Sequence, residues 1–166
     1  MIKFQNLFAV LNEESVQYLV VGGIAVNLYG IERATADIDL VVDLEEGNVK
    51  RFVNALKKMG LKPKVPVALD DFADADKRKS WIEEKGMMVF NLYDPQNSFF
   101  EFDVFVEVPF DFKKVFDARE EMTAGGVVIP VVPLDQLIEM KEKAGRPQDR
   151  ADVYHLKKII DEWKDE

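Results

Sequence analysis

Residues 18–40 read YLVVGGIAVNLYGIERATADIDL, and this stretch decides the fold. Its order is an apolar run, two glycines, a short apolar segment, and two aspartates on either side of one isoleucine. The pattern predicts a buried strand over 18–21, a helix over 24–30 that Gly30 ends, and a second strand over 38–43. Strands disfavour Asp, and a glycine pair weakens backbone order. Because local rules fail mainly at functional sites, we expect one here.

The rest of the chain continues as an α/β sequence with mixed connectivity. The spacing of apolar residues predicts helices over 2–14, 45–60, 111–118, 134–144 and 148–163. Two apolar runs on either side of the turn residues 94–97 predict a β-hairpin. Prolines confine the extended segment 127–135 to an edge or a strand end, and the polar segment 70–86 is expected to be a loop or a short surface helix. We therefore expect an α/β (α+β) fold with a helical C-terminus and a mixed sheet flanked by helices, whose central strands are 18–21, 38–43, 87–93 and 100–107.

The composition restricts both the class of protein and its chemistry. With 166 residues, 48% of them apolar, we expect a single domain over 1–166, with 134–166 as closing helices. The sequence shows neither an apolar run of about 18 residues nor a signal peptide, so we expect a cytoplasmic protein without a membrane partner. With no cysteine and one histidine, catalysis must use carboxylates, Lys, Arg, hydroxyls or backbone groups. The net charge of -9 disfavours extended nucleic acid as a partner.

Asp37 and Asp39 lie two residues apart at the second expected strand, so their side chains share one face, about 6.5–7 Å from each other. Two such carboxylates repel each other unless a cation lies between them, and oxygen ligands suit Mg²⁺. The alternative, commoner for an isolated Asp-x-Asp pair, is the solvated face of a strand start. Asp103 is a third candidate, because a buried unpaired carboxylate needs a metal, a catalytic role or a partner. Its alternative is an edge strand whose solvated face also carries Glu101.

Gly22 and Gly23 stand between the first expected strand and the first short helix. A strand–glycine–helix unit leaves free backbone N–H groups at the helix N-terminus, and glycine lets a phosphate approach them closely. The glycines and the aspartates together predict a site where phosphates and a metal ion meet.

The order of these motifs resembles the polymerase-β-like nucleotidyltransferase superfamily: an apolar strand, Gly-Gly, a helix, Asp-x-Asp, and a later strand with a single Asp. The resemblance implies that Gly22 and Gly23 bind nucleotide phosphates. It also implies that Asp37, Asp39 and Asp103 are catalytic carboxylates that bind metal. Many members have Ser at the position of Gly23. Compared with that Ser, Gly23 keeps the backbone N–H but lacks the hydroxyl.

Two segments, 22–40 and 133–156, resemble more specifically the AbiEii-type, minimal nucleotidyltransferase branch. In that branch Arg-x-Thr/Ser precedes the Asp-x-Asp pair, and a Lys…Arg…Asp…Asp pattern lies on the closing helices. The matching residues here are Arg33, Thr35, Lys141, Arg146, Asp149 and Asp152, of which the first four are implied to bind nucleotide. For Lys141 the alternative is a solvated basic face that follows Glu139 and Glu142. The two aspartates are expected to anchor Arg146 or to cap the last helix.

The superfamily resemblance implies transfer of a nucleoside monophosphate from a Mg²⁺-bound nucleoside triphosphate (NTP) to an acceptor hydroxyl. Two metal ions would be held by the carboxylates, Asp103 would act as general base, and Lys141 or Arg33 would neutralise the β- and γ-phosphates. The acceptor stays open among a small molecule, an RNA end and a protein. Two alternatives are a nucleotide-binding or interaction module without turnover, and the toxin component of a toxin–antitoxin system. An antitoxin or a second copy of the chain is then a candidate partner.

Overall fold

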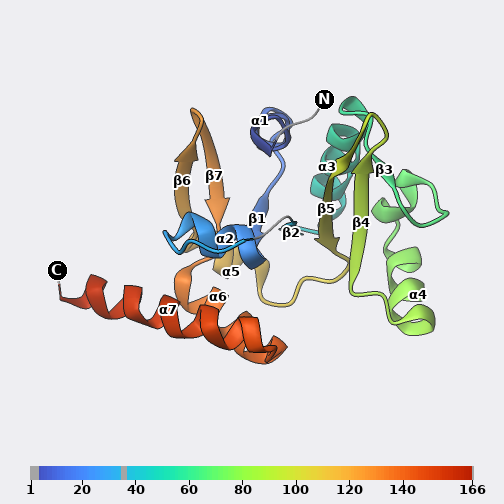
Figure 1. Cartoon of the computed structure of the whole chain (residues 1–166). Helices are drawn as coiled ribbons and strands as arrows, with labels where there is room; N and C mark the ends of the chain where they lie inside the picture. The colour runs from blue at the N-terminus through green and yellow to red at the C-terminus, as the bar shows by residue number, and fades with distance from the viewer. Residues whose placement is uncertain (1–3, 35–36, 166) are drawn as a thin grey trace.

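The computed structural model describes residues 4–34 and 37–165, and its centre is a mixed seven-stranded sheet (Figure 1). The strand order is β3-β4-β5-β2-β1-β7-β6. The strands are β1 (Tyr18–Val21), β2 (Ile38–Val42), β3 (Lys62–Pro63), β4 (Val89–Asp94), β5 (Asn97–Phe105), β6 (Glu120–Ala124) and β7 (Val127–Val131). The helices are α1 (Phe4–Glu13), α2 (Gly22–Leu28), α3 (Glu46–Lys58), the 3₁₀ helix η1 (Leu69–Ala73), α4 (Ala75–Lys85), α5 (Phe112–Asp117), α6 (Leu134–Ala144) and α7 (Pro147–Lys164).

The middle of the sheet carries both strand directions. β1 and β2 are antiparallel neighbours joined through α2, whereas β2 pairs parallel with β5 and β1 pairs parallel with β7. All four residues of β1 are buried, as expected for a strand covered on both faces. The expected mixed sheet, flanked by helices and followed by a helical C-terminus, is confirmed.

The edges of the sheet differ from the expectation. The four strands predicted as central are all interior, but β7 is interior too, because β6 pairs with its outer side. Parallel pairing of β7 with β1 is confined to Val131 opposite Val20, so Pro130 stays outside that ladder. A proline is tolerated there because it lies next to the strand end. The edge strands β3 and β6 are short and polar, and the sequence pattern did not predict them.

α3, η1 and α4 cover one face of β4 through a chain of aromatic rings. The ring centroids of Phe52 and Phe72 lie 5.7 Å apart, those of Phe72 and Phe90 5.1 Å, and those of Trp81 and Phe90 5.3 Å. The expected loop or short helix at 70–86 is an 11-residue helix, which Asp74 caps at its start and Gly86 ends with a φ of 61°. Burying Trp81 against Phe90 stabilises a helix that has few other apolar residues.

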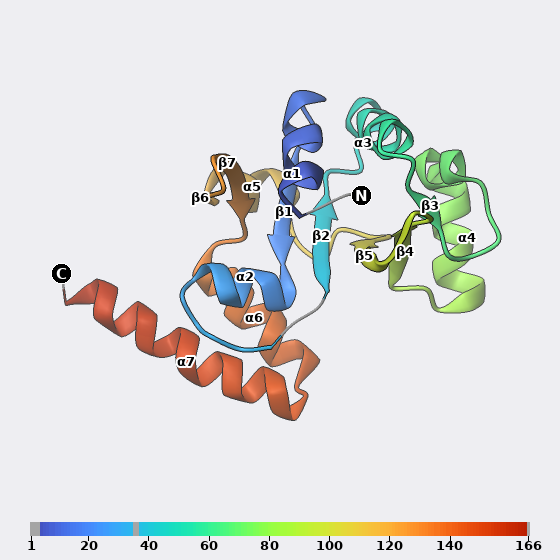
Figure 2. The same ribbon diagram turned by 45° about the horizontal axis from the view of Figure 1, so that its top comes forward.

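α6 and α7 pack against each other, and α6 contacts α2, so the C-terminal helices lie beside the first strand–helix unit (Figure 2). Gly145, at a φ of 63°, ends α6 in the left-handed conformation, and Pro147 begins α7. No helix in the described part of the chain is long and apolar enough to cross a membrane.

Candidate active site

Gly22 is the first residue of α2 and lies against Asp39 of the neighbouring strand. The helix begins two residues earlier than the sequence predicted, and Gly22 has a φ of 70°. A Cβ atom at this position would come within 2.2 Å of the Asp39 Oδ2 atom. Glycine is therefore required twice, by the backbone conformation and by the approach of a carboxylate. The N-cap residue, Val21, offers no side-chain acceptor, so it leaves the N–H groups of the first turn uncapped.

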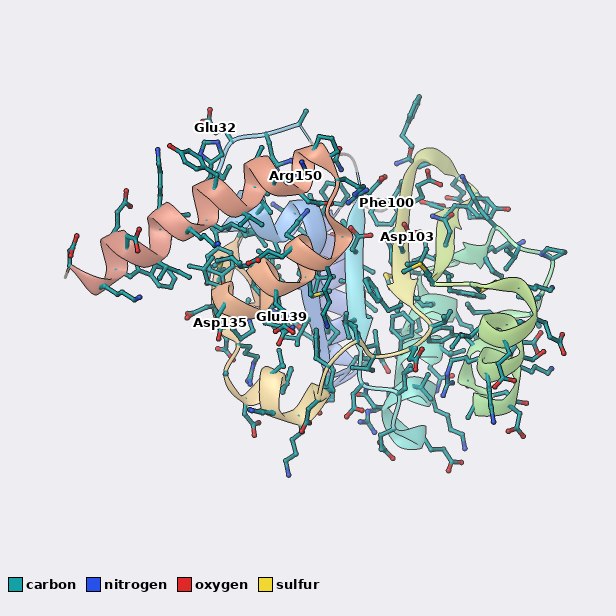
Figure 3. All side chains as sticks on the ribbon, turned by 90° about the horizontal axis from the view of Figure 1, so that it is seen from below. Glu32, Phe100, Asp103, Asp135, Glu139 and Arg150 are labelled. Carbon is teal, nitrogen blue, oxygen red and sulfur yellow. The ribbon has the colours of Figure 1, made fainter. Side chains whose placement is uncertain are left out.

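Asp39 and Asp103 occupy partner positions on the parallel strands β2 and β5. Neighbouring strands lie about 4.8 Å apart, and directly paired residues point to the same face. Figure 3 shows Asp103 on β5 next to β2. The two carboxylates that the sequence placed 64 positions apart along the chain therefore come together, within the range that one metal site spans.

Burial and like charge both act on Asp39. They raise the pKa of its carboxyl to about 6, chiefly through desolvation, then through the charges of Asp103 and Asp37. The positive charges of Lys141 and Arg146 oppose the shift. Three carboxylates and two cations from distant parts of the chain therefore lie close enough together for their charges to interact.

Asp103 has a hydrogen-bond partner that the sequence did not single out. The Nδ2 of Asn91 on β4 donates to the Asp103 Oδ1 atom at 2.7 Å. The pKa of Asp103 lies above its ordinary value, chiefly because of desolvation. The hydrogen bond from Asn91 opposes this rise, and the charge of Asp37 adds to it. The Oδ1 atom of Asn91 is buried and has no hydrogen-bond partner among the described residues.

Lys141 is buried, with 6% of its surface exposed, so the alternative of a solvated basic face is wrong. Its Nζ lies 3.2 Å from Asp149 Oδ1 and 3.1 Å from Asp152 Oδ2. Arg33 reaches the same Asp152 carboxylate at 2.6 Å, which ties the segment after α2 to α7. We call these residues, together with Arg146, the ion-pair cluster.

Asp149 acts at the start of α7 as the sequence suggested. Its Oδ2 accepts from the Arg146 backbone N–H at 3.2 Å and from the Arg146 Nε at 2.8 Å. The expected anchoring of Arg146 by Asp149 is confirmed, and Asp152 instead pairs with Lys141 and Arg33. Thr35, the other residue implied to bind nucleotide, lies outside the described residues.

Comparison with solved structures identifies the architecture. The lincosamide antibiotic adenylyltransferase LnuA, in its lincomycin-bound form, superposes with a TM-score of 0.60 and 17% identity, over 92% of this chain and 93% of that one. The chain has a nucleotidyltransferase fold. The antibiotic-resistance factor ANT(2'')-Ia gives a TM-score of 0.56 at 12% identity, over 90% of this chain and 77% of that one. A Thermotoga maritima protein described as a nucleotidyltransferase gives 0.56 at 17% identity, over 94% and 89%. No model of a protein family matches the sequence, and neither does any curated protein.

On this nucleotidyltransferase fold, the paired carboxylates suit a hard divalent cation such as Mg²⁺. They offer oxygen ligands only, and their mutual repulsion and burial are relieved when a cation binds. Because Gly22 has no Cβ atom, the Asp39 carboxylate can lie against the start of α2, where a side chain would collide with it. Within 4–34 and 37–165, no three His, Cys, Asp or Glu side chains already form a metal-binding group. The fit therefore rests on the Asp39–Asp103 pair, with Asp37 exposed beside it.

Proposed function

We propose that this protein transfers a nucleoside monophosphate from an NTP to an acceptor hydroxyl. The observation that carries the proposal is the register of Asp39 with Asp103. Beside this pair lies Gly22, where any side chain would collide with the Asp39 carboxylate. Aligned carboxylates beside an uncapped helix start provide both a cation site and a phosphate site. The nucleotidyltransferase fold supports this assignment.

Each residue group has one task in the proposed reaction. The N–H groups at Gly22 and Gly23 donate hydrogen bonds to the phosphates of the NTP. Asp37, Asp39 and Asp103 would hold Mg²⁺, which when bound stabilises the charge on the attacking and leaving oxygens. Asp103 takes the proton of the acceptor hydroxyl while the hydroxyl oxygen forms a bond to the α-phosphorus. The bond from the α-phosphorus to the bridging oxygen breaks, and pyrophosphate leaves.

The ion-pair cluster supplies the positive field behind the phosphates. It contains three cations, Arg33, Lys141 and Arg146, and two carboxylates, Asp149 and Asp152, so one positive charge is left over. Lys141 is held by both carboxylates and acts through its charge and position. Arg146, whose side chain is largely exposed, is the member best able to contact a phosphate directly.

The acceptor that fits best is a small molecule. Beyond Asp103, the face of β4 and β5 opposite the buried aromatic rings carries half-buried Asn91, Tyr93 and Glu101 and the 95% exposed Phe99. Such a face offers hydrogen-bond acceptors and aromatic surface, which suit a hydroxyl- or amine-bearing ring. LnuA, bound to lincomycin, and ANT(2'')-Ia, solved with adenylyl-2''-tobramycin, are neighbours that act on such molecules.

A second candidate is an AbiEii-type activity on RNA or protein, as the toxin of a toxin–antitoxin system. The convergence of Arg33, Lys141, Arg146, Asp149 and Asp152 favours it, because these are the residues that carry the resemblance to that branch. The net charge of -9 disfavours extended RNA over a compact acceptor.

The test is a transfer assay with NTPs labelled at the α-phosphate, offered separately with hydroxyl-bearing small molecules, total RNA and the protein itself. We expect label on a small molecule, release of pyrophosphate, and no transfer from γ-labelled NTP. Asp103→Asn should lower the rate by about 100-fold or more, because the general base is lost. The matched control Asp161→Asn changes an exposed carboxylate on α7 and should behave like the parent. Label on RNA or protein alone would favour the second candidate, and no label on any acceptor would contradict turnover.

A further inference from the structure

Arg78, in the first half of α4, is a buried cation without an ion-pair partner. Only 7% of its surface is exposed, yet among the described residues no Asp or Glu lies within ion-pair distance of it. Burial lowers the pKa of Arg78, and the charge of Asp74 at the start of the helix opposes this shift. One hydrogen bond is formed, from Nη1 to the backbone oxygen of Phe72 at 2.5 Å, and the guanidinium lies 5.7 Å from the centre of the Phe72 ring. Buried arginines are rare unless paired, so this one is unusual.

Arg78 is one of the residues that line a solvent-open pocket of ≈ 520 Å³. The pocket lies between α4 and the segment that leaves β5, and its apolar wall comes from Leu44, Ile82, Val106 and Val108. Of the charged residues that line it, the exposed Lys79 is paired with the exposed Glu83 at 3.9 Å, Glu107 is exposed to solvent, and Arg78 is the buried cation, with no ion pair among the described residues. The volume is in the usual range for small-ligand sites.

An apolar hollow of ≈ 460 Å³ continues this pocket. The two share Ile82, Val106, Glu107 and Val108, and the second adds Pro109 and Met88, which is 75% exposed. A ligand whose charged group meets Arg78 would therefore find mainly apolar surface for the rest of its length, with the exposed Glu107 as the one carboxylate among the described residues that line the second hollow. A methionine at such a surface adapts its shape to what packs on it.

We propose that this pocket binds a small amphipathic anion, with one carboxylate or phosphate group on Arg78 and an apolar body along Val106–Pro109. A guanidinium carries five N–H donors in a fork that matches either oxyanion, and only one donor here has a protein acceptor. Binding an oxyanion would give the buried charge the partner that the fold does not provide. The shielded position strengthens such a charge-assisted contact.

This pocket is separate from the candidate active site. Asp39 lies near the start of β2, whereas the pocket is lined by Leu44, beyond the end of the same strand. α4 and α7 lie on opposite sides of the molecule in two views (Figures 1 and 2). The inference does not depend on nucleotidyl transfer.

The test titrates the unaltered protein with octanoate, octyl phosphate and octanol while backbone amide shifts are followed by NMR. We expect at least one anion to shift the amides of α4 and of 106–109 and to bind at least tenfold more tightly than octanol, because the alcohol cannot pair with the guanidinium. The two anions have eight carbons each and carry a carboxylate or a phosphate, so their relative affinities decide between the two head groups. Equal binding of octanol, shifts confined to other regions, or no shifts would overturn the proposal.

Variants then assign the charge to its residue. Arg78→Met should abolish the advantage of the anions, and Arg78→Lys should lower it, because an ammonium keeps the charge but loses the fork. Lys85→Met is the matched control: it removes an exposed lysine of the same helix that lines neither pocket, and should leave the anion affinity within about twofold of the parent, as expected for a screened surface charge. An equal loss in Lys85→Met would overturn the assignment to Arg78. The octanol comparison in the unaltered protein decides the proposal even where Arg78→Met fails to fold.

Discussion

Gly22 is the residue on which the geometry around Asp39 depends most directly. From the sequence, the glycine pair was explained by the approach of a phosphate to free N–H groups. The structure adds a second reason, because the Asp39 carboxylate itself occupies the space that a Cβ atom would need. A single residue thus allows both the helix start and the placement of a catalytic candidate.

We predict that Gly22→Ala lowers the free energy of unfolding by about 2–4 kcal/mol and weakens nucleotide binding. A positive φ costs a non-glycine residue about 1–2 kcal/mol, and displacing Asp39 adds to that. Gly60→Ala is a close control, since Gly60 has a φ of 69° against 70° and no atom within 4 Å of the added Cβ. Gly60→Ala should lower the free energy of unfolding only by the cost of the positive φ. Urea denaturation measures both values, and equal losses in the two variants would show that the Asp39 contact is unimportant.

Asp39 should also make stability depend on pH. Its pKa is about 6 in the folded protein against an ordinary 3.8, so between these values the folded state keeps a proton that the unfolded state has released. The free energy of unfolding therefore falls as pH rises from about 4 to about 6, and the loss is complete above that window. Below pH 4 both states are protonated, and the contribution vanishes.

Asp39→Asn removes this penalty, so it should stabilise the protein at pH 7.5 by about 1–3 kcal/mol and leave it nearly unchanged at pH 4. Thermal unfolding of both proteins at the two pH values, in a buffer with a metal chelator, gives the comparison. A stabilisation that is the same at both pH values would mean that the Asp39 charge is not the cause.

Among the elements, α6 and α7 carry the clearest difference between sequence and structure. The closing helices were predicted almost to the residue, because Gly145 and Pro147 mark their boundary. The burial of Lys141 was not predicted, because charged neighbours at helical spacing are typical of an exposed lysine. For an exposed lysine, replacement by alanine would hardly change the free energy of unfolding. Its burial between Asp149 and Asp152 depends on how α7 turns back over α6, which no local pattern specifies.

Lys141→Met should therefore lower the free energy of unfolding by about 3–5 kcal/mol, because it leaves two buried carboxylates without their shared partner. Lys143→Met, on the same helix, removes a lysine that is 74% exposed and should change stability by less than about 0.5 kcal/mol. Urea denaturation at pH 7.5 measures the difference. A loss in Lys141→Met no larger than in the control would contradict the buried ion-pair cluster.

The hairpin of β4 and β5 shows a second limit of sequence patterns. Its two strands and its turn were predicted, but counting back from the pair Asp94 and Asn97 would place Asn91 opposite Phe100. A register shift at Tyr93 and Asp94 instead brings Asn91 opposite Asp103. Bulges of this kind change which side chains meet without changing the apolar alternation, so the hydrogen bond to Asp103 was not predictable.

At the scale of the whole molecule, the candidate site is assembled from positions 22, 39, 91, 103 and 141. The fold class followed from the order of the apolar runs and from the motifs that resemble known nucleotidyltransferases. That Asp39 and Asp103 belong to one site was expected through that resemblance, but the parallel pairing of β2 with β5, which brings them together, was not predicted. The edge strands β3 and β6 were missed because they are short and polar, and they lie away from the site.

The most direct test of the central claim is a calorimetric titration of ATP, with Mg²⁺ or with a chelator, into the parent and into the double variant Asp39→Asn/Asp103→Asn. We predict that the parent binds ATP at least tenfold more tightly with Mg²⁺, and that the double variant loses this difference because the oxygen ligands are gone. Asp161→Asn should bind like the parent. A double variant that binds Mg²⁺–ATP as the parent does would contradict the assignment of Asp39 and Asp103 to the nucleotide site.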